Sequence, residues 1–144
     1  MKLHLITIGE PKLAYARQGW AEYTKRLGRY HSVRVTHLAD KYAADSAAML
    51  RAAGNAYKVA LVIDGAQLSS EQLAQFLEQR AVEARELCFF IGGPEGLPQD
   101  VIGECEYRWS FSTLTFPHDL AMVVLAESLY RASTIAVGHP YHKA

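Results

Sequence analysis

Only two cysteines, Cys88 and Cys105, occur in the 144 residues, and neither has the spacing of a CxxC or Cys/His metal site. We therefore expect two buried, reduced thiols, no bound metal and a cytoplasmic location. No apolar run approaches the roughly 20 residues of a membrane-spanning helix, so no membrane partner is expected. The opening residues 1–8 are too short for the apolar core of a secretory signal and are predicted to form a strand.

The chain also lacks net charge, which argues against a protein that coats any nucleic acid. Its charges are nevertheless uneven, because residues 1–41 carry eight Lys or Arg and three acidic residues, whereas the remainder carries seven and twelve. A local basic face suits docking on a shaped RNA site, and a solvated helix face is the alternative interpretation. Neither a P-loop nor the GxGxxG fingerprint is present, which disfavours nucleotide phosphate binding and a Rossmann dehydrogenase.

Strand-like and helix-like segments alternate without a linker or repeat, and predict one domain over residues 1–144. The apolar runs at 58–63 and 87–91 are typical of strands buried on both faces. Ser69 and Gln72 have the spacing of a capping box at a helix start. We expect an α/β fold, a mainly parallel sheet with helices on both faces. The expected strands are 2–8, 32–38, 58–63, 87–91 and 106–111, and the expected helices are 11–29, 43–53, 70–85, 98–104 and 117–136.

Three loops follow the most strongly predicted strands: residues 64–65, 92–98 and 112–117. Ligands of parallel sheets bind beyond the carboxyl ends of the strands, so these loops locate a candidate site. Gly92 and Gly93 allow the backbone to approach a ligand closely, although on their own they are typical of a tight strand-to-helix turn. The hydroxyl-rich segment 112–117 has backbone groups for an adenine edge, and a simple helix start is the alternative.

The last predicted helix is apolar nearly all round, without a break from Leu120 to Ala126. A helix without a polar face is buried, and full burial in so small a chain suggests a second subunit. A central core helix in a monomer is the alternative. Glu127 and Arg131 are four residues apart and can pair. The tail gathers side chains that stack on bases, contact phosphate or move protons: His139, Tyr141, His142 and Lys143.

Taken together, four motifs resemble those of the RlmH family, the ribosomal RNA large-subunit methyltransferases of the SPOUT class. The motifs are Ile91-Gly92-Gly93-Pro94-Glu95-Gly96-Leu97, Trp109-Ser110 to Leu114-Thr115-Phe116-Pro117-His118, Ala126-Glu127-Ser128-Leu129-Tyr130-Arg131-Ala132, and His139-Pro140-Tyr141-His142. The resemblance spans the whole chain, and the order and spacing of the motifs together make it specific.

The resemblance implies a SPOUT-type fold with a deep C-terminal trefoil knot, and a homodimer with the last helix in its interface. It implies S-adenosylmethionine as the cofactor. The substrate would be a pseudouridine of 23S ribosomal RNA in the assembled ribosome, methylated at N3. The implied cofactor contacts are Ile63, Asp64, Gly92, Gly93, Ser112, Thr113, Leu114, Thr115, Phe116 and Pro117.

The candidate catalytic residues are His118, Arg131, His139, Tyr141 and His142. Methyl transfer needs a nucleophile held in line with the methyl donor, and the weakly acidic N3–H of pseudouridine needs a base. His118 or the histidines and tyrosine of the tail are expected to position the substrate and accept the proton, and a residue that only caps the last helix is the alternative for His118. Arg131 is expected to stabilise the developing negative charge.

One position departs from the family pattern. Family members commonly carry an arginine four residues beyond the histidine that corresponds to His118, and this chain has Met122 there. An RNA or dimer contact would then come from elsewhere, for instance from Arg131 or Lys143. Two alternatives remain open: a transfer RNA methyltransferase of the same fold, and a non-catalytic ribosome-binding module. The intact glycine loop and segment 112–117 count against the second.

Overall fold

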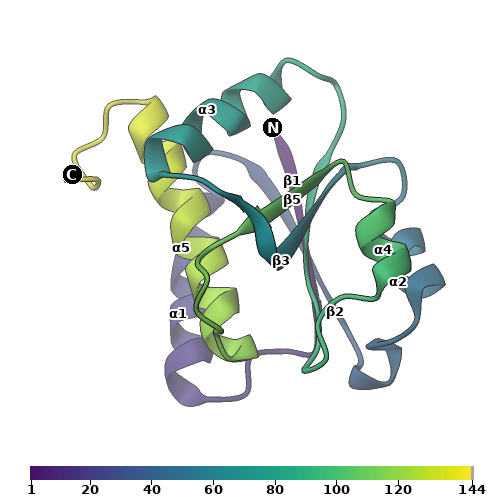
Figure 1. Cartoon of the computed structure of the whole chain (residues 1–144). Helices are drawn as coiled ribbons and strands as arrows, with labels where there is room; N and C mark the ends of the chain where they lie inside the picture. The colour runs from purple at the N-terminus through teal and green to yellow at the C-terminus, as the bar shows by residue number, and fades with distance from the viewer. Residues whose placement is uncertain (144) are drawn as a thin grey trace.

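A computed structural model describes residues 1–143 and shows a five-stranded sheet (Figure 1). The strands lie in the order β2-β1-β4-β3-β5, and every neighbouring pair is parallel. The predicted α/β class and mainly parallel sheet are confirmed. The strands are β1 (Lys2–Ile8), β2 (Ser32–Leu38), β3 (Tyr57–Gln67), β4 (Leu87–Ile91) and β5 (Tyr107–Ser110).

Helices cover both faces of this sheet, as predicted (Figure 1). Successive side chains of a strand point to opposite faces. Phe89 of β4 therefore packs under one layer of helices and Phe90 under the other. The layer over Phe89 consists of α1 (Ala14–Leu27), α3 (Ser70–Ala81) and α5 (His118–Ala136). The layer over Phe90 consists of α2 (Ser46–Ala53) and α4 (Gln99–Gly103). A short 3-10 helix, η1, spans Asp40–Tyr42.

Side-chain caps fix the starts of two helices. The Ser69 hydroxyl accepts a hydrogen bond from the Gln72 N–H at 3.0 Å, and the Gln72 side chain accepts one from the Ser69 N–H at 2.8 Å. The predicted capping box of α3 is therefore confirmed. The Asp45 carboxylate accepts from the Ala48 N–H at 3.0 Å and caps α2 in the same manner.

The carboxyl end of β3 differs from its prediction. The sequence predicts that residues 64–65 end the strand, but β3 continues to Gln67 after a break in the ladder. Leu61 and Ala66 both pair with Trp109, so the residues between them bulge out of the sheet. A Cβ on Gly65, which lies in this bulge, would be 2.8 Å from backbone atoms of Trp109. Glycine therefore allows the bulged strand to pass close to β5 instead of turning away.

Helix α5 is enclosed along almost its whole length, as its composition predicts. Residues 118–135 are all buried or half-buried. Met122 is fully buried in the core beneath α1, α3 and α5. Methionine, which replaces the arginine common in the family, therefore packs inside the subunit, and its side chain cannot contact RNA.

The two cysteines are unpaired, with Cys88 buried and Cys105 half-buried. Burial raises the pKa of Cys88 and raises that of Cys105 to about 11, so both remain thiols at neutral pH. Within residues 1–143, no group of three or more His, Cys, Asp or Glu side chains is arranged to hold a metal ion. No helix in the same range is long and apolar enough to cross a membrane.

His31 joins the turn after α1 to α5. Its Nε2 lies 2.8 Å from the Ser133 hydroxyl, which donates its own hydrogen to the Leu129 carbonyl at 2.8 Å. Nε2 must therefore carry the hydrogen, and Nδ1 is buried without a partner among the described residues. Burial, together with repulsion by the N-terminal ammonium group, lowers the pKa of His31 to about 4.

Acid should therefore destabilise the fold through His31. Between its ordinary pKa of 6.5 and the folded value of about 4, the unfolded chain binds the proton more readily. The contribution of His31 to the free energy of unfolding is complete above pH 6.5 and is lost as the pH falls toward 4. We expect His31→Gln, which keeps a donor for Ser133 and does not titrate, to lose less stability over this range in urea titrations. An unchanged pH dependence would contradict this assignment.

Candidate functional site

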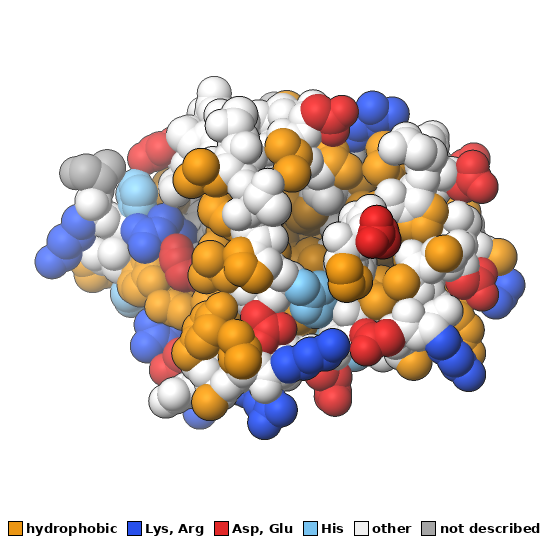
Figure 2. All heavy atoms as spheres, turned by 60° about the horizontal axis from the view of Figure 1, so that its bottom comes forward, with side chains coloured by type: hydrophobic (Ala, Val, Ile, Leu, Met, Phe, Trp, Pro, Cys, Tyr) orange, Lys and Arg blue, Asp and Glu red, His pale blue; other side chains and the backbone are white. Residues whose placement is uncertain are grey.

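A cavity of about 760 Å³ opens at the carboxyl ends of β3, β4 and β5. The loop after β4 and the start of α5, which border the cavity, lie toward the bottom of Figure 1. This side comes forward in Figure 2, where a histidine lies in the centre between apolar, acidic and Lys or Arg side chains. Asp64 and Thr113 are exposed and lie outside the lining. The other predicted cofactor residues come together around the cavity: Ile63, Gly92, Gly93, Ser112, Leu114, Thr115, Phe116 and Pro117.

The glycine loop after β4 folds back on itself at this cavity. A Cβ on Gly92 would lie 2.5 Å from the carbonyl carbon of Gly96 and 2.6 Å from the nitrogen of Leu97. Gly96 has a φ of +78°, in the left-handed region that favours glycine, and its N–H donates to the Gly93 carbonyl at 2.9 Å. The loop is thus a tight turn and also a wall of the cavity. Close approach of a ligand to Gly92 and Gly93 stays a prediction.

Aromatic rings and backbone groups form the opposite wall. Phe111 stacks with Phe116, with ring centres 6.2 Å apart, and meets Trp109 edge-on at 4.9 Å. The Ser112 hydroxyl accepts from the Leu114 N–H at 3.0 Å and shapes the loop. An apolar slot with backbone donors and acceptors, in a volume usual for small-molecule sites, fits an adenosine-containing cofactor.

His118 begins α5 and lines the same cavity. Its Nδ1 lies 3.5 Å from one carboxylate oxygen of Asp119, whose other oxygen accepts from the N–H groups of Lys12 at 2.9 Å and Leu13 at 2.7 Å. Burial alone raises the pKa of Asp119, but these hydrogen bonds and His118 hold it below its ordinary value. The Nε2 atom of His118 is buried with no protein partner among residues 1–143. A ligand can therefore reach it only when the side chains that cover it move.

Arg131 and His142 form a second cluster at the other end of α5. Glu127 accepts from Arg131 Nε at 2.8 Å. Arg131 also lies 3.1 Å from His142 Nδ1, and His142 Nε2 lies 2.9 Å from a Glu71 carboxylate oxygen. Because arginine only donates, Nδ1 of His142 must be the acceptor and Nε2 must carry the hydrogen. A chain of hydrogen bonds therefore fastens the tail to α5 and α3.

Tyr141 belongs to this second cluster. Its ring meets Tyr130 edge-on with centres 4.7 Å apart, and the Arg131 guanidinium lies 4.9 Å from the ring centre. Burial and its hydrogen bond with Tyr23 raise the pKa of Tyr141, so the hydroxyl stays protonated. His139 is exposed, and its Nδ1 accepts from the Tyr141 N–H at 3.1 Å.

The predicted catalytic residues therefore fall into two groups. His118 lies in the first turn of α5, whereas Arg131 lies near its end. At 1.5 Å of rise per residue, the two are about 20 Å apart along the helix axis. A single subunit does not bring His118 together with Arg131 and the tail.

The chain matches one protein family, and curated members of that family, over nearly its whole length. A family model described as a predicted SPOUT methyltransferase matches residues 1–142. A "Ribosomal RNA large subunit methyltransferase H" of Deinococcus radiodurans is 52% identical over 145 residues, which cover 99% of each chain. A protein of the same name from Stenotrophomonas maltophilia is 42% identical over 156 residues and covers 100% of both chains.

Two solved structures show the same fold at low identity. TrmJ from Z. mobilis ZM4 aligns with a TM-score of 0.53 and 12% identity, covering 93% of this chain and 70% of that one. A probable methylase family protein from Haemophilus influenzae aligns with a TM-score of 0.58 and 11% identity, covering 99% of this chain and 70% of that one. At such identities the likeness concerns the fold alone.

Proposed function

Because the chain belongs to the SPOUT methyltransferases, and within them to the family of ribosomal RNA large subunit methyltransferases H, we propose that it methylates N3 of a pseudouridine in 23S ribosomal RNA. Its methyl donor is S-adenosylmethionine, and its substrate is the assembled ribosome in the cytoplasm. The observation that carries the proposal is 52% identity to a large-subunit RNA methyltransferase over 99% of both chains. The knotted path of the C-terminal segment belongs to the same proposal.

The cavity at the ends of β3, β4 and β5 has the size and lining for this cofactor. Its glycine loop has no room for a Cβ at Gly92, so the backbone itself forms the wall. We assign the adenosine to the loop after β4 and to segment 112–117, with Ile63 and Asp64 on the bulge of β3 beside it. When bound, the cofactor supplies an electrophilic methyl group. A non-catalytic ribosome-binding module has no need of such a cavity.

We assign the acceptance of the N3 proton to His118. Its Nδ1 faces the Asp119 carboxylate, so Nε2 is the free acceptor, and the side chains that cover Nε2 must move when the substrate base binds. Asp119 is itself held by the backbone N–H groups of Lys12 and Leu13, so it orients the ring and stabilises the imidazolium formed by proton transfer. Deprotonated pseudouridine carries a negative charge, and no Lys or Arg of the described chain lines the cavity. A cation must therefore come from elsewhere.

A second subunit supplies that cation in the proposed homodimer. Leu120 and Val124 of α5 stay half-buried on the stripe that leads to Glu127 and Arg131, as expected of an uncompleted helix interface. Antiparallel packing of two α5 helices about a twofold axis brings Arg131 of one subunit to the end of the other subunit's α5 at which His118 lies. The tail, fastened to Arg131 through His142, arrives with it. His139 and Tyr141 then help to position the substrate base.

Calorimetric titration and a methylation assay test this function. We expect saturable binding of S-adenosylmethionine and none of NADH, followed by transfer of labelled methyl groups to ribosomes that lack the modification. Ribosomal RNA without proteins and deproteinised transfer RNA serve as matched substrates. Methylation of transfer RNA in place of ribosomes would assign the protein to the alternative enzyme class. Absence of both S-adenosylmethionine binding and methylation would favour the alternative of a non-catalytic ribosome-binding module.

A further inference from the structure

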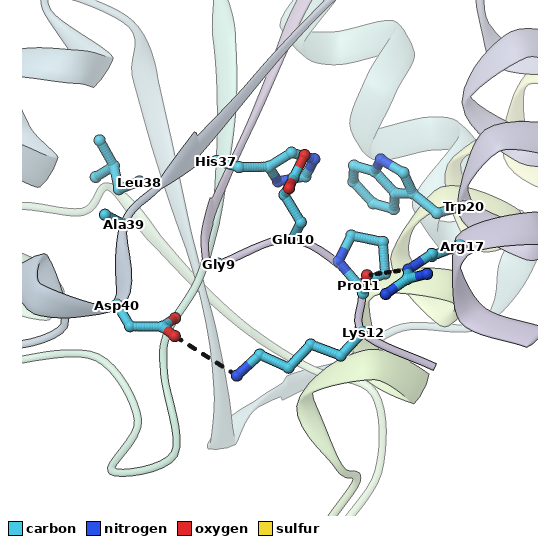
Figure 3. A pocket seen from close by; sticks show the side chains of 10 residues that line it. All are labelled: Gly9, Glu10, Pro11, Lys12, Arg17, Trp20, His37, Leu38, Ala39 and Asp40. Atoms are coloured by element: carbon cyan, nitrogen blue, oxygen red, sulfur yellow. Dashed lines mark hydrogen bonds and ion pairs between the residues drawn. The ribbon is translucent and has the colours of Figure 1, made fainter. Parts of the chain in front are cut away.

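A second cavity, of about 750 Å³, lies beside the first at the carboxyl ends of β1 and β2 (Figure 3). Segments 9–12 and 37–40 form it together with Arg17 and Trp20 of α1. The two cavities share no lining residue. They are nevertheless adjacent, because the N–H of Lys12 on the wall of the second cavity donates to Asp119, the neighbour of His118 in the first. No side chain that lines this second cavity has a role in the function proposed above.

The hydrogen bonds of His37 define which ring nitrogen faces the cavity. The Thr7 hydroxyl donates its only hydrogen to the Gly9 carbonyl at 2.7 Å, and it also bonds to Nδ1 of His37. Nδ1 must therefore donate, which leaves Nε2 as an acceptor with no partner among residues 1–143. Burial and the neighbouring His118 lower the pKa of His37, against the opposing effect of Glu10, so the ring is neutral at neutral pH.

The cavity also has cations that are free to change partners. Lys12 pairs with Asp40 at 3.5 Å, but both side chains are about two-thirds exposed or more, at 72% and 67%. An ion pair so exposed is worth about 0–1 kcal/mol, so Lys12 can leave it for a phosphate. Arg17 donates only its Nε, to the Pro11 carbonyl at 3.2 Å. In Figure 3, His37 and Trp20 lie at one end of the cavity and the Lys12–Asp40 pair spans the other.

We propose that this cavity binds a second nucleotide of the RNA, one that flanks the methylated position. A base N–H donates to Nε2 of His37, the base lies against the edge of Trp20, and Lys12 and Arg17 contact the phosphate. The proposal rests on the proposed function, and it gives a role to two of the eight basic residues in the first 41 positions. A single-stranded nucleotide presents an aromatic ring with N–H donors and an adjacent negative charge, which is the combination that the cavity complements.

Steady-state methylation of ribosomes by two matched variants tests the proposal. Arg17→Ala should raise the KM for ribosomes about fivefold or more, because a phosphate contact is lost. The kcat and the S-adenosylmethionine Kd should stay within about twofold of wild type, since the cofactor cavity is untouched. Arg29→Ala removes the same charge from an exposed position outside the cavity and should leave KM within about twofold. An equal rise in KM for both variants would show that the effect comes from the general charge of the protein, and would overturn the proposed site.

Ultraviolet cross-linking of the wild-type protein to ribosomes gives an independent measurement. We expect mass spectrometry to find a nucleotide attached to residues 9–20 or to His37. Cross-links from these residues to a ribosomal protein, or nucleotide adducts elsewhere only, would overturn the proposal. Methylation by the wild type separates the failure of the second nucleotide site from the failure of the methyltransferase function. If the wild type methylates ribosomes while the cavity variant behaves like its control, the second nucleotide site is wrong and the methyltransferase function stands.

Discussion

Replacement of Gly92 by alanine should weaken S-adenosylmethionine binding by about 100-fold. The added Cβ would lie 2.5 to 2.8 Å from backbone atoms of Gly96 and Leu97, and backbone cannot rotate away as a side chain can. Overpacking of this kind costs about 1–3 kcal/mol, and the upper end of that range corresponds to about a 100-fold change in Kd. Calorimetric titration measures the Kd, and thermal unfolding shows how far the loop strain also lowers stability.

Gly103→Ala is the matched control for this substitution. Gly103 lies in the short helix α4, no heavy atom lies within 4 Å of the position that an added Cβ would occupy, and its φ is not positive. Alanine is also the better helix former, so stability should be unchanged or slightly higher. We expect wild-type cofactor affinity for Gly103→Ala. Wild-type affinity for Gly92→Ala as well would show that the loop after β4 does not form the cofactor site.

The fold was predictable where local pattern decides structure. The run Leu87-Cys88-Phe89-Phe90-Ile91 is apolar at every position because both faces of β4 are covered, and its bounds match the prediction. The end of β3 was not predictable in this way. Asp and Gly usually end a strand, but here the glycine serves the close passage of β5, which lies more than 40 residues further along the chain.

In the candidate site too, residues fixed by local sequence pattern were predictable, whereas a residue that depends on contacts distant in sequence was not. Gly92, Gly93 and segment 112–117, apart from Thr113, were predictable as lining residues because each segment follows a strand of a parallel sheet. The sequence gives no reason to select Asp119, since an acid in the first turn of a helix is usually only a favourable charge near the helix dipole. Its proposed role depends on Lys12 and Leu13, which are more than 100 residues away in sequence.

Heterodimers of two inactive variants should recover about half of the wild-type activity. His118→Ala and Arg131→Ala homodimers should each lose about 100-fold or more, because each removes a group that acts in the transition state. In a heterodimer of the two, one site combines both substitutions, and the other combines an intact His118 with an intact Arg131 from across the interface. Two affinity tags isolate the heterodimer, and single-turnover methylation of ribosomes measures its rate.

The reciprocal heterodimer decides between one subunit and two. Pairing wild type with the double variant His118→Ala/Arg131→Ala spoils one residue in each site if the sites are shared, so activity should stay low. If each site belonged to one subunit, this second heterodimer would keep about half of the activity and the first would be inactive. The distance of about 20 Å between His118 and Arg131 along α5 favours the shared arrangement. Since the same helix carries both residues and the half-buried apolar stripe, the proposed arrangement makes dimer formation and completion of the catalytic site a single event.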